Sequence, residues 1–368
     1  MVITRSDTMG GAQMHVETLA QWLLSRDLEI LVVSGGNGIL LRRLSAMNIC
    51  CLAFPSLRHQ ISLYADLIAF IELAKLVFRF KPDIVCAHSF KAASLVRLLS
   101  IFGFIRCCCI TAHGWSHIRA ANTKLVRRLY ILIEQILNIG SDAVITVSYS
   151  DAHYSRALAL AAFHKTFTIH NGCVDYAASL ACRNRQKRSM LNFVSIMRFE
   201  YPKDPATVIQ ALLALRELPW HFTFIGDGPE LNRCIDLVEE YKLSSRITFL
   251  GFLDDARLLL PSYDVFVLSS LSEGLPVSII EALCCGLPVV ASDVGGVSEL
   301  VESSVNGFLF RPGIAPDLSK ALSSFILNPG LVHSFGFSSR KLYVDNFSSN
   351  TMCEATFSLY QKLCASNN

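Results

Sequence analysis

Residues 268–301 read LSSLSEGLPVSIIEALCCGLPVVASDVGGVSELV, and they predict a strand end, a loop, a helix and a second strand in succession. The apolar run 264–270 is typical of a buried strand, and the run 287–293 is typical of another. Pro276 suits the first position of the helix between them, and Gly286 suits its end. This strand–helix–strand order indicates a parallel sheet, in which ligands bind at the carboxyl ends of the strands.

Two glutamates, Glu273 in the loop and Glu281 in the helix, are the candidate ligand-binding groups of this stretch. An ionised carboxylate can accept two hydroxyl groups at once, which suits a ribose or a pyranose, and we expect the helix dipole to keep Glu281 ionised. Backbone N–H groups near the start of the helix suit an anion or a hydroxyl-rich ligand. These amides belong to Gly274, Leu275, Val277 and Ser278. On chemistry alone, a helix-capping glutamate and an exposed surface glutamate explain the pattern equally well.

Apolar strand-like segments alternate with amphipathic helical segments along the whole chain, which predicts two parallel-sheet α/β domains. Strands are expected at 1–7, 29–35, 83–89, 107–114, 142–148, 191–198, 222–228, 247–252, 264–270 and 287–293. The polar, basic segment 175–190 interrupts this pattern, so we predict one domain at 1–180 and a second at 190–345. Residues 346–368 are expected to form a last amphipathic helix, which caps the second domain or crosses back to the first.

The composition favours a two-domain protein with large buried cores. The chain has 368 residues, of which 52% are hydrophobic and 17% charged, so it is too apolar to be disordered. Every long apolar stretch contains a charge, which predicts that no helix spans a membrane, and the opening MVITRSDTMGG lacks the apolar core of a signal peptide. The thirteen cysteines lie mostly in apolar runs without a Cys-x-x-Cys pair, which indicates buried, reduced thiols in a cytoplasmic protein.

Charge is distributed unevenly between the two halves. Residues 1–188 carry 21 Lys and Arg against 11 Asp and Glu, a net charge of +10, and residues 189–368 carry 12 against 19, a net charge of −7. The basic segment 116–138 mixes its cations with apolar residues, which suits peripheral binding to an anionic membrane surface. An ordinary amphipathic helix packed on its sheet would show the same pattern.

Other candidate ligand-binding residues also follow predicted strands. Arg198 and Lys203 come after the strand 191–198 and suit a diphosphate, although two solvated loop charges are an alternative. Gly10 and Gly11 permit close approach of a ligand to a helix start, or simply form a tight turn. His113 ends the strand 107–114 and is either a ligand contact or a structural histidine. The sequence has no dinucleotide fingerprint, phosphate-binding lysine loop, nucleophile elbow or metal-ligand spacing.

Eight segments, taken in order, resemble glycosyltransferase family 4, the retaining nucleotide-sugar transferases of GT-B fold. They are GGAQMHVETLA, TAHGW, VSYSDAHY, IHNGCVD, MRFEYPKDP, FIGDGPEL, ITFLGFLDD and SEGLPVSIIEALCCGLPVVASDVGGVSELV. The last resembles the family's Glu-x7-Glu signature followed by its Gly-x-Pro-Val strand and Gly-Gly turn. The resemblance implies two Rossmann-like domains facing each other across a cleft. It also implies transfer of a hexose or N-acetylhexosamine from a nucleotide-diphosphate sugar to a glycan or lipid-linked acceptor, in cell-surface polysaccharide synthesis.

The resemblance also implies roles for the residues of the donor-side domain. Glu281 would hold the ribose hydroxyls of the donor nucleotide, and Glu273 would face the transferred sugar. Arg198 and Lys203 would hold the diphosphate, and the amides after Glu273 would bind sugar and phosphate oxygens. These cations would replace a divalent metal ion, so no metal or cofactor is expected.

For the acceptor-side domain, the resemblance implies that His113 lies beside the transferred sugar. Gly10 and Gly11 would let this domain close on the donor. The expected location is cytoplasmic, peripheral on the inner face of the plasma membrane, and no nucleic-acid partner is expected. Two alternatives to a transferase remain, namely a nucleotide-sugar epimerase or hydrolase of the same fold and a non-catalytic sugar-nucleotide-binding subunit.

Overall fold

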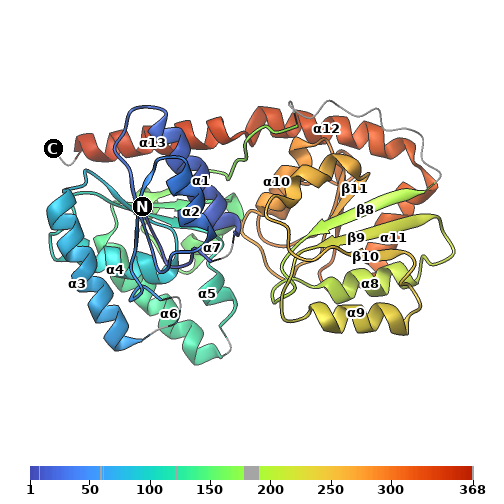
Figure 1. The fold of residues 1–368 in the computed structure, drawn as a ribbon, viewed down its shortest axis with the longest axis horizontal. Helices are drawn as coiled ribbons and strands as arrows, with labels where there is room; N and C mark the ends of the chain where they lie inside the picture. The colour runs from blue at the N-terminus through green and yellow to red at the C-terminus, as the bar shows by residue number, and fades with distance from the viewer. Residues whose placement is uncertain (8, 59, 61, 122, 178–189, 367–368) are drawn as a thin grey trace. The chain divides into compact units, whose positions relative to one another are not determined.

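A computed structural model of the chain consists of two compact units, each built around its own sheet (Figure 1). The structure describes residues 1–7, 9–58, 60, 62–121, 123–177 and 190–366. Unit 1 comprises Met1–Gly172 and Ser349–Asn368, and unit 2 comprises Cys173–Ser348. Most of the predicted boundary segment, 175–190, lies outside the described residues.

Unit 1 contains a seven-stranded parallel sheet with the strand order β3-β2-β1-β4-β5-β6-β7. Its strands are β1 (Val2–Ile3), β2 (Leu31–Ser34), β3 (Cys50–Ala53), β4 (Val85–Ala87), β5 (Cys108–Ala112), β6 (Ala143–Thr146) and β7 (Thr166–Thr168). Its helices are α1 (Gly11–Leu24), α2 (Ile39–Ala46), α3 (Leu63–Phe80), α4 (Phe90–Ile101), α5 (Ser116–Arg119), α6 (Lys124–Leu137), α7 (Tyr149–Ala157) and α13 (Ser349–Ser366).

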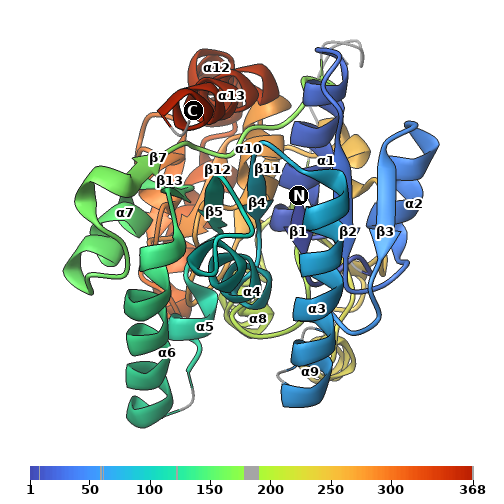
Figure 2. The same ribbon diagram turned by 90° about the vertical axis from the view of Figure 1, so that its left-hand side faces the viewer.

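Helices cover both faces of the unit 1 sheet, and each face has its own apolar core. On one face, α3 and α4 pack with residues such as Val85 and Ile110 of β4 and β5. Figure 2 shows α3 and α6 on either side of α4 in this layer. On the other face, α1 packs against α2 and against the last helix, α13. Because the sheet is buried on both sides, its central strands are almost continuously apolar.

The last helix, α13, belongs to unit 1 although the whole of unit 2 separates it in sequence from the rest of that unit. Met352 and Tyr360 of α13 contribute to the core that includes Leu19 of α1. At the surface, Trp22 Nε1 donates a hydrogen bond of 2.8 Å to Asn350 Oδ1. The first and last helices therefore form one packed pair in unit 1 (Figure 1).

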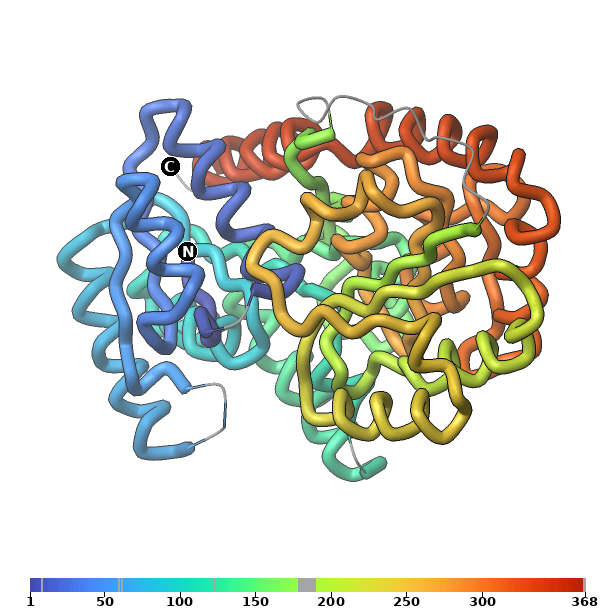
Figure 3. Tube along the Cα trace, turned by 45° about the vertical axis from the view of Figure 1, so that its right-hand side comes forward, coloured from blue at the N-terminus to red at the C-terminus, as the bar shows by residue number. Residues whose placement is uncertain are grey.

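Unit 2 contains a six-stranded parallel sheet with the order β10-β9-β8-β11-β12-β13. Its strands are β8 (Leu191–Ile196), β9 (Trp220–Ile225), β10 (Ile247–Phe249), β11 (Val265–Leu268), β12 (Val289–Ser292) and β13 (Gly307–Phe310). Its helices are α8 (Pro205–Leu213), α9 (Leu231–Glu240), α10 (Val277–Cys284), α11 (Ala315–Leu327) and α12 (Gly330–Asn346). The gold helix α9 lies beside the yellow-green α8 in the trace of Figure 3.

Both sheets are parallel and carry helices, so the predicted α/β class with two Rossmann-like sheets is confirmed. The twelve cysteines among the described residues are free thiols, and eight of them are buried. Within the described part of the chain, no helix combines the length and the hydropathy needed to cross a bilayer.

Candidate functional site

Two loops of unit 2 are joined at the carboxyl ends of the neighbouring strands β8 and β11. Leu271 N donates to Pro202 O at 2.8 Å, and Asp204 N donates to Ser269 O at 3.1 Å. The Asp204 side chain also accepts a hydrogen bond from Thr207 N and so caps α8. The loop that carries Lys203 is therefore fixed both to α8 and to the loop that carries Glu273.

This pairing brings Lys203 and Glu273 into direct contact. Lys203 Nζ lies 2.5 Å from Glu273 Oε1, and Ser270 Oγ donates to the same oxygen at 2.6 Å. The Lys203 and Glu273 side chains are only 18% and 13% exposed, so solvent screens this ion pair less than a surface pair. The site thus holds an ammonium group and a carboxylate that are pre-organised by their neighbours.

The loop after Glu273 leads directly into α10. Gly296 N, in the turn after β12, donates to Gly274 O at 2.8 Å, and Leu275 is buried. Val277 and Ser278 are the first two residues of α10, and no side chain among the described residues caps this helix. The first backbone N–H groups of a helix have no partner within it, so these amides can bind an anion or a hydroxyl oxygen.

Glu281 lies in the second turn of α10 and is 4% exposed. Burial raises the pKa of Glu281 to about 7, although the nearby Arg257 opposes this shift. This corrects the expectation that the helix dipole keeps Glu281 fully ionised, because the cost of burying the charge outweighs the dipole at this position. Tyr176 Oη donates to the backbone oxygen of Glu281 at 2.9 Å and fixes this part of the helix.

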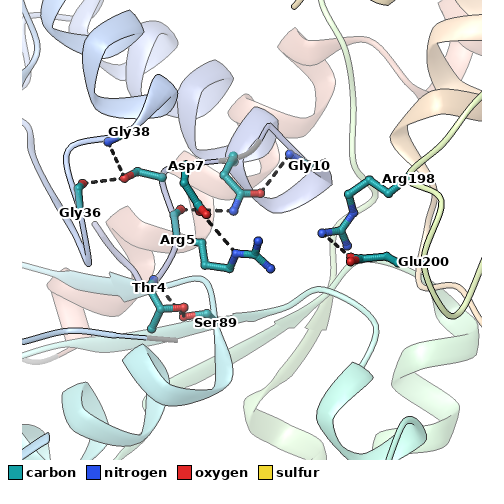
Figure 4. Close-up of polar contacts among 11 residues, drawn as sticks. Thr4, Arg5, Asp7, Gly10, Gly36, Gly38, Ser89, Arg198 and Glu200 are labelled. Carbon is teal, nitrogen blue, oxygen red and sulfur yellow. Dashed lines mark hydrogen bonds and ion pairs between the residues drawn. The ribbon is translucent and has the colours of Figure 1, made fainter. Parts of the chain in front are cut away.

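Arg198 also follows β8, but its contacts differ from those of Lys203. Its side chain is 50% exposed, and Arg198 Nη1 lies 2.7 Å from Glu200 Oε1 (Figure 4). The backbone around it is held by the loop after β9, because Phe199 N donates to Asp227 O at 2.9 Å. Arg198 is thus a cation on a fixed backbone with an exposed side chain.

Two glycines explain how the loop after β9 approaches Arg198 so closely. Gly226 and Gly228 have φ angles of +140° and +153°. A Cβ atom at Gly226 would lie 1.8 Å from Met197 O, and one at Gly228 would lie 2.6 Å from Phe199 O. Any larger residue would therefore push the Arg198 loop away.

In unit 1, the predicted Gly10 and Gly11 lie at the start of α1. Gly10 is the residue before the helix, and its N–H group donates to Gln13 Oε1 at 3.2 Å (Figure 4). Gln13 Nε2 donates in turn to Arg5 O, which ties the helix start to the loop after β1. The φ angle of Gly10 is −114°, a value open to any residue, so its backbone conformation does not require glycine.

His113 lies just beyond β5 and belongs to a cluster of three histidines. His88 follows the neighbouring strand β4, and His15 comes from α1. The ring centroids are 5.0 Å apart for His15 and His113, 5.3 Å for His15 and His88, and 5.7 Å for His88 and His113. Asn171, after β7, contacts the cluster, with its Oδ1 atom 3.1 Å from His15 Nδ1.

The three imidazoles are neutral over the ordinary pH range. Burial lowers the pKa of His15 to about 4, although the hydrogen bond with Asn171 opposes this shift. Burial, followed by the charge of the neighbouring rings, lowers the pKa of His88 and His113 well below the ordinary histidine value. The cluster can therefore donate and accept hydrogen bonds but carries no charge. No group of His, Cys, Asp and Glu in the described part of the chain, this cluster included, has a geometry suited to a metal ion.

The structure therefore brings some of the predicted residues together within each unit. In unit 2, Lys203 touches Glu273, and Gly274 to Glu281 follow in one loop and helix, whereas Arg198 pairs with Glu200. Sequence patterns had given no role to Ser270, Tyr176 or the histidine partners of His113. Ser270 and His88 follow strands, which is the only sequence signal for them, and neither His15 on α1 nor Tyr176 has such a signal.

Two family models match the chain. The glycosyltransferase family 4 model matches residues 9–175, and the glycosyl transferases group 1 model matches residues 184–342. The Escherichia coli UDP-Gal:α-D-GlcNAc-diphosphoundecaprenol α-1,3-galactosyltransferase is 30% identical over 274 residues, which cover 70% of each chain. The Escherichia coli O-antigen biosynthesis glycosyltransferase WbnH is 27% identical over 311 residues, which cover 84% of each chain.

Among solved structures, Anabaena HepE in complex with UDP and glucose superposes with a TM-score of 0.83. The match covers 98% of this chain and 99% of HepE at 20% sequence identity, so it shows the fold. The family models and the galactosyltransferase together show more than the fold: the chain belongs to glycosyltransferase family 4 and is a glycosyltransferase.

Proposed function

We propose that this glycosyltransferase moves a hexose or N-acetylhexosamine from a UDP-sugar to a glycan or lipid-linked acceptor, with retention of the anomeric configuration, in cell-surface polysaccharide synthesis. The observation that carries the proposal is the fixed Lys203–Glu273 pair next to the open N-terminus of α10. Support for the donor and the acceptor comes from the Escherichia coli relative, whose name gives UDP-galactose and a diphosphoundecaprenol-linked N-acetylglucosamine.

In this proposal, Lys203 and Arg198 bind the leaving diphosphate. Breaking the anomeric C–O bond places negative charge on the diphosphate and positive charge on the sugar ring. Lys203, Arg198 and the first N–H groups of α10 stabilise the negative charge, which makes the reaction independent of a metal ion. Glu273 faces the positive sugar ring and stabilises the oxocarbenium-like transition state electrostatically.

The acceptor oxygen then forms the new bond on the face from which the diphosphate leaves. Its proton passes to the departing diphosphate oxygen, which becomes more basic as the old bond breaks. His113 is neutral, so we assign it a hydrogen bond to the transferred sugar rather than a charge-stabilising role. Gly10 and Gly11 belong to the acceptor side. Glu281 holds the ribose hydroxyls of the donor in its ionised form.

A turnover assay on the purified protein tests the transfer reaction. UDP release is measured with each UDP-sugar, with and without a diphospholipid-linked N-acetylglucosamine acceptor, and in the presence of a chelator. We expect release that depends on the acceptor and persists with the chelator. Release without the acceptor would instead favour a hydrolase, conversion of the donor sugar without release would favour an epimerase, and donor binding without any reaction would favour a non-catalytic subunit.

Substitutions in unit 2 test the assigned residues. Glu273→Gln and Arg198→Ala should each lower turnover at least about tenfold, because each removes one pre-organised electrostatic contact. Glu217→Gln and Arg216→Ala are matched controls, since these two side chains are 87% and 66% exposed in a loop before β9. Wild-type rates in both site variants would refute the site.

We also propose that the enzyme works on the cytoplasmic face of the plasma membrane as a peripheral protein. A lipid-linked acceptor would be presented there, and the basic first half of the chain suits an anionic leaflet. Cell fractionation that leaves the enzyme in the soluble fraction, at both low and high salt, would contradict this location.

A further inference from the structure

The solvent-exposed face of helix α6 carries a row of apolar side chains. Leu125, Leu129, Leu132 and Ile136 follow one another at spacings of four and three residues, and Ile139 continues the row just beyond the helix. Residues at these spacings lie on one face of a helix. Each of the five side chains is more than 50% exposed. An apolar row of this length in a soluble unit normally faces the core.

The inner side of α6 explains why the row points outward. Glu134 and Arg97 are 2% and 0% exposed, and Arg97 Nη1 lies 2.5 Å from Glu134 Oε2. His117 Nε2 lies 3.2 Å from Glu134 Oε1, and Arg97 Nε donates to Ser141 Oγ at 2.8 Å. This buried polar network fixes the rotation of α6 on unit 1, because turning the apolar row inward would expose Glu134 and leave Arg97 buried without its partner.

Helix α3, in the same layer, carries a second exposed apolar row. Tyr64, Leu67, Ile71 and Phe78 are exposed at helical spacing, and Lys75 takes the place between Ile71 and Phe78. Both helices pack against α4, as Figure 2 shows. A Phe70–Phe102 ring contact joins α3 to the end of α4, and a Phe90–Tyr130 ring contact joins the start of α4 to α6. The two rows thus belong to one helical layer of unit 1.

Positive charge accompanies the α6 row. Residues 124–139 contain three Lys and Arg and a single acid, the buried Glu134, a net charge of +2, whereas residues 63–80 carry two cations and two acids. Lys124, Arg127 and Arg128 are exposed on α6. Long cationic side chains beside apolar ones reach outward to phosphates while their apolar neighbours enter an acyl layer. A partner protein would instead have to bury Lys75 inside the apolar row of α3, which is costly without an acid opposite it.

We propose that the outer faces of α3 and α6 form the surface by which unit 1 binds an anionic lipid bilayer. The apolar rows enter the boundary between headgroups and acyl chains, and the cations bind lipid phosphates. This inference rests on the proposed function, in which the acceptor is linked to a lipid, and it deepens that function by naming the side chains that hold the enzyme at the bilayer.

Co-sedimentation of the full chain with vesicles tests the surface. Phosphatidylcholine vesicles with and without phosphatidylglycerol are compared at low and high salt. Wild-type protein should bind only the vesicles that contain phosphatidylglycerol. Leu129→Ser/Leu132→Ser/Ile136→Ser should lower the partition coefficient at least about tenfold, because three apolar side chains no longer enter the bilayer. Arg127→Gln/Arg128→Gln should lower it at least about tenfold at low salt and much less at high salt.

A matched control and an independent activity assay separate the possible results. Leu327→Ser/Phe337→Ser/Val344→Ser replaces three exposed apolar residues of unit 2 and should bind vesicles like the wild type. All variants should keep wild-type turnover with a water-soluble acceptor analogue. If the α6 variants bind vesicles like the wild type, the proposed lipid-binding surface is refuted, whereas the proposed transferase function is unaffected. Vesicle binding without any acceptor-dependent turnover would refute the proposed function and leave the surface intact.

Self-association is the remaining result to test. Sedimentation velocity is measured on the wild type and on the α6 apolar variant without lipid. We expect monomers for both proteins. A wild-type dimer that the α6 variant abolishes, together with no vesicle binding, would assign these rows to a second copy of the chain and overturn the lipid assignment.

Discussion

Lys203 Nζ lies 2.5 Å from Glu273 Oε1, so a residue assigned to the diphosphate and a residue assigned to the sugar form one ion pair. With a donor bound, the Lys203 ammonium group would have to contact both the phosphate oxygens of the donor and the Glu273 carboxylate. The two side chains should therefore behave as a unit in catalysis and not as independent contacts.

Lys203→Met should lower kcat at least about tenfold, because it removes a charge that stabilises the leaving group. We expect Lys203→Met/Glu273→Gln to lose much less than the product of the two single losses, since each single substitution already disrupts the pair. Steady-state kinetics with saturating acceptor measure all four proteins. Multiplicative losses would show that the two residues act separately.

Glu281→Gln should stabilise unit 2 at high pH while weakening donor binding. The pKa of Glu281 is about 7 in the folded chain, above the ordinary value of 4.5, so the unfolded chain loses its proton first. Stability therefore falls as pH rises from about 4.5 through 7, by up to about 3 kcal/mol. The neutral amide avoids this loss, so urea denaturation at pH 8 should favour the variant, with the difference vanishing near pH 4.

The matched control for Glu281→Gln is Glu217→Gln, because Glu217 is exposed in the same unit. This control should show no gain in stability at high pH. Calorimetric titration with UDP should give weaker binding to Glu281→Gln than to the wild type. If Glu281→Gln and the wild type are equally stable at pH 8, then Glu281 is not a buried carboxylate that loses its proton in the folded chain.

The histidine cluster predicts a second pH dependence, of opposite sign. The pKa of His15 is about 4, below the ordinary 6.5, so the folded chain keeps His15 neutral where the unfolded chain becomes protonated. The stability contributed by burying this neutral ring is present above pH 6.5 and is lost as pH falls towards 4. NMR titration of the His15 ring protons should give a midpoint near pH 4.

Asn171→Asp should raise the pKa of His15, because a carboxylate replaces the amide oxygen that lies 3.1 Å from His15 Nδ1. The resulting imidazolium would lie beside His88 and His113, so we expect turnover to fall at neutral pH and the acid limb of the pH–rate profile to move upward. Asn171→Leu lacks the charge and should keep the low midpoint. A wild-type midpoint near 6.5 would contradict a neutral cluster.

Glu134→Gln should destabilise unit 1 by about 3–5 kcal/mol, because Arg97 would keep a buried charge without its carboxylate. Although burial opposes ionisation, His117 and Arg97 keep the pKa of Glu134 below its ordinary value, so this stabilisation is present at neutral pH and is lost in acid. Arg97→Met/Glu134→Leu should recover part of the loss. Urea denaturation measures each variant, and a loss below about 1 kcal/mol in Glu134→Gln would show that the pair is dispensable.

Sequence patterns predict the central strands of both sheets and miss three edge strands. β3, β7 and β13 each lie at the end of a sheet, and their side chains are largely half-buried or exposed. Such strands lack the continuous apolar run that marks a strand covered on both faces. The alternation of strands and helices was nevertheless sufficient for the α/β class, because the buried central strands determine it.

In the candidate site, the sequence supplies the residue types but not their partners. Lys203 and Glu273 are 70 positions apart, and they meet because β8 lies next to β11 in the sheet order. The pKa of Glu281 depends on how completely its helix is covered, which spacing does not reveal. His15 gave no signal and His88 gave only its place after a strand, because each is a single histidine whose ring neighbours are distant in the sequence.

The place of α13 in unit 1 has a consequence for biosynthesis. Residues of α13 such as Tyr360 and Met352 fill part of a core whose remaining members lie in the first half of the chain. Unit 2 is continuous in sequence, so it can fold while the tail is still inside the ribosome. Most of unit 1 is translated before unit 2, so its core is closed only after the residues of α13 have been translated. A nascent chain stalled before residue 349 should expose that apolar surface to chaperones and proteases.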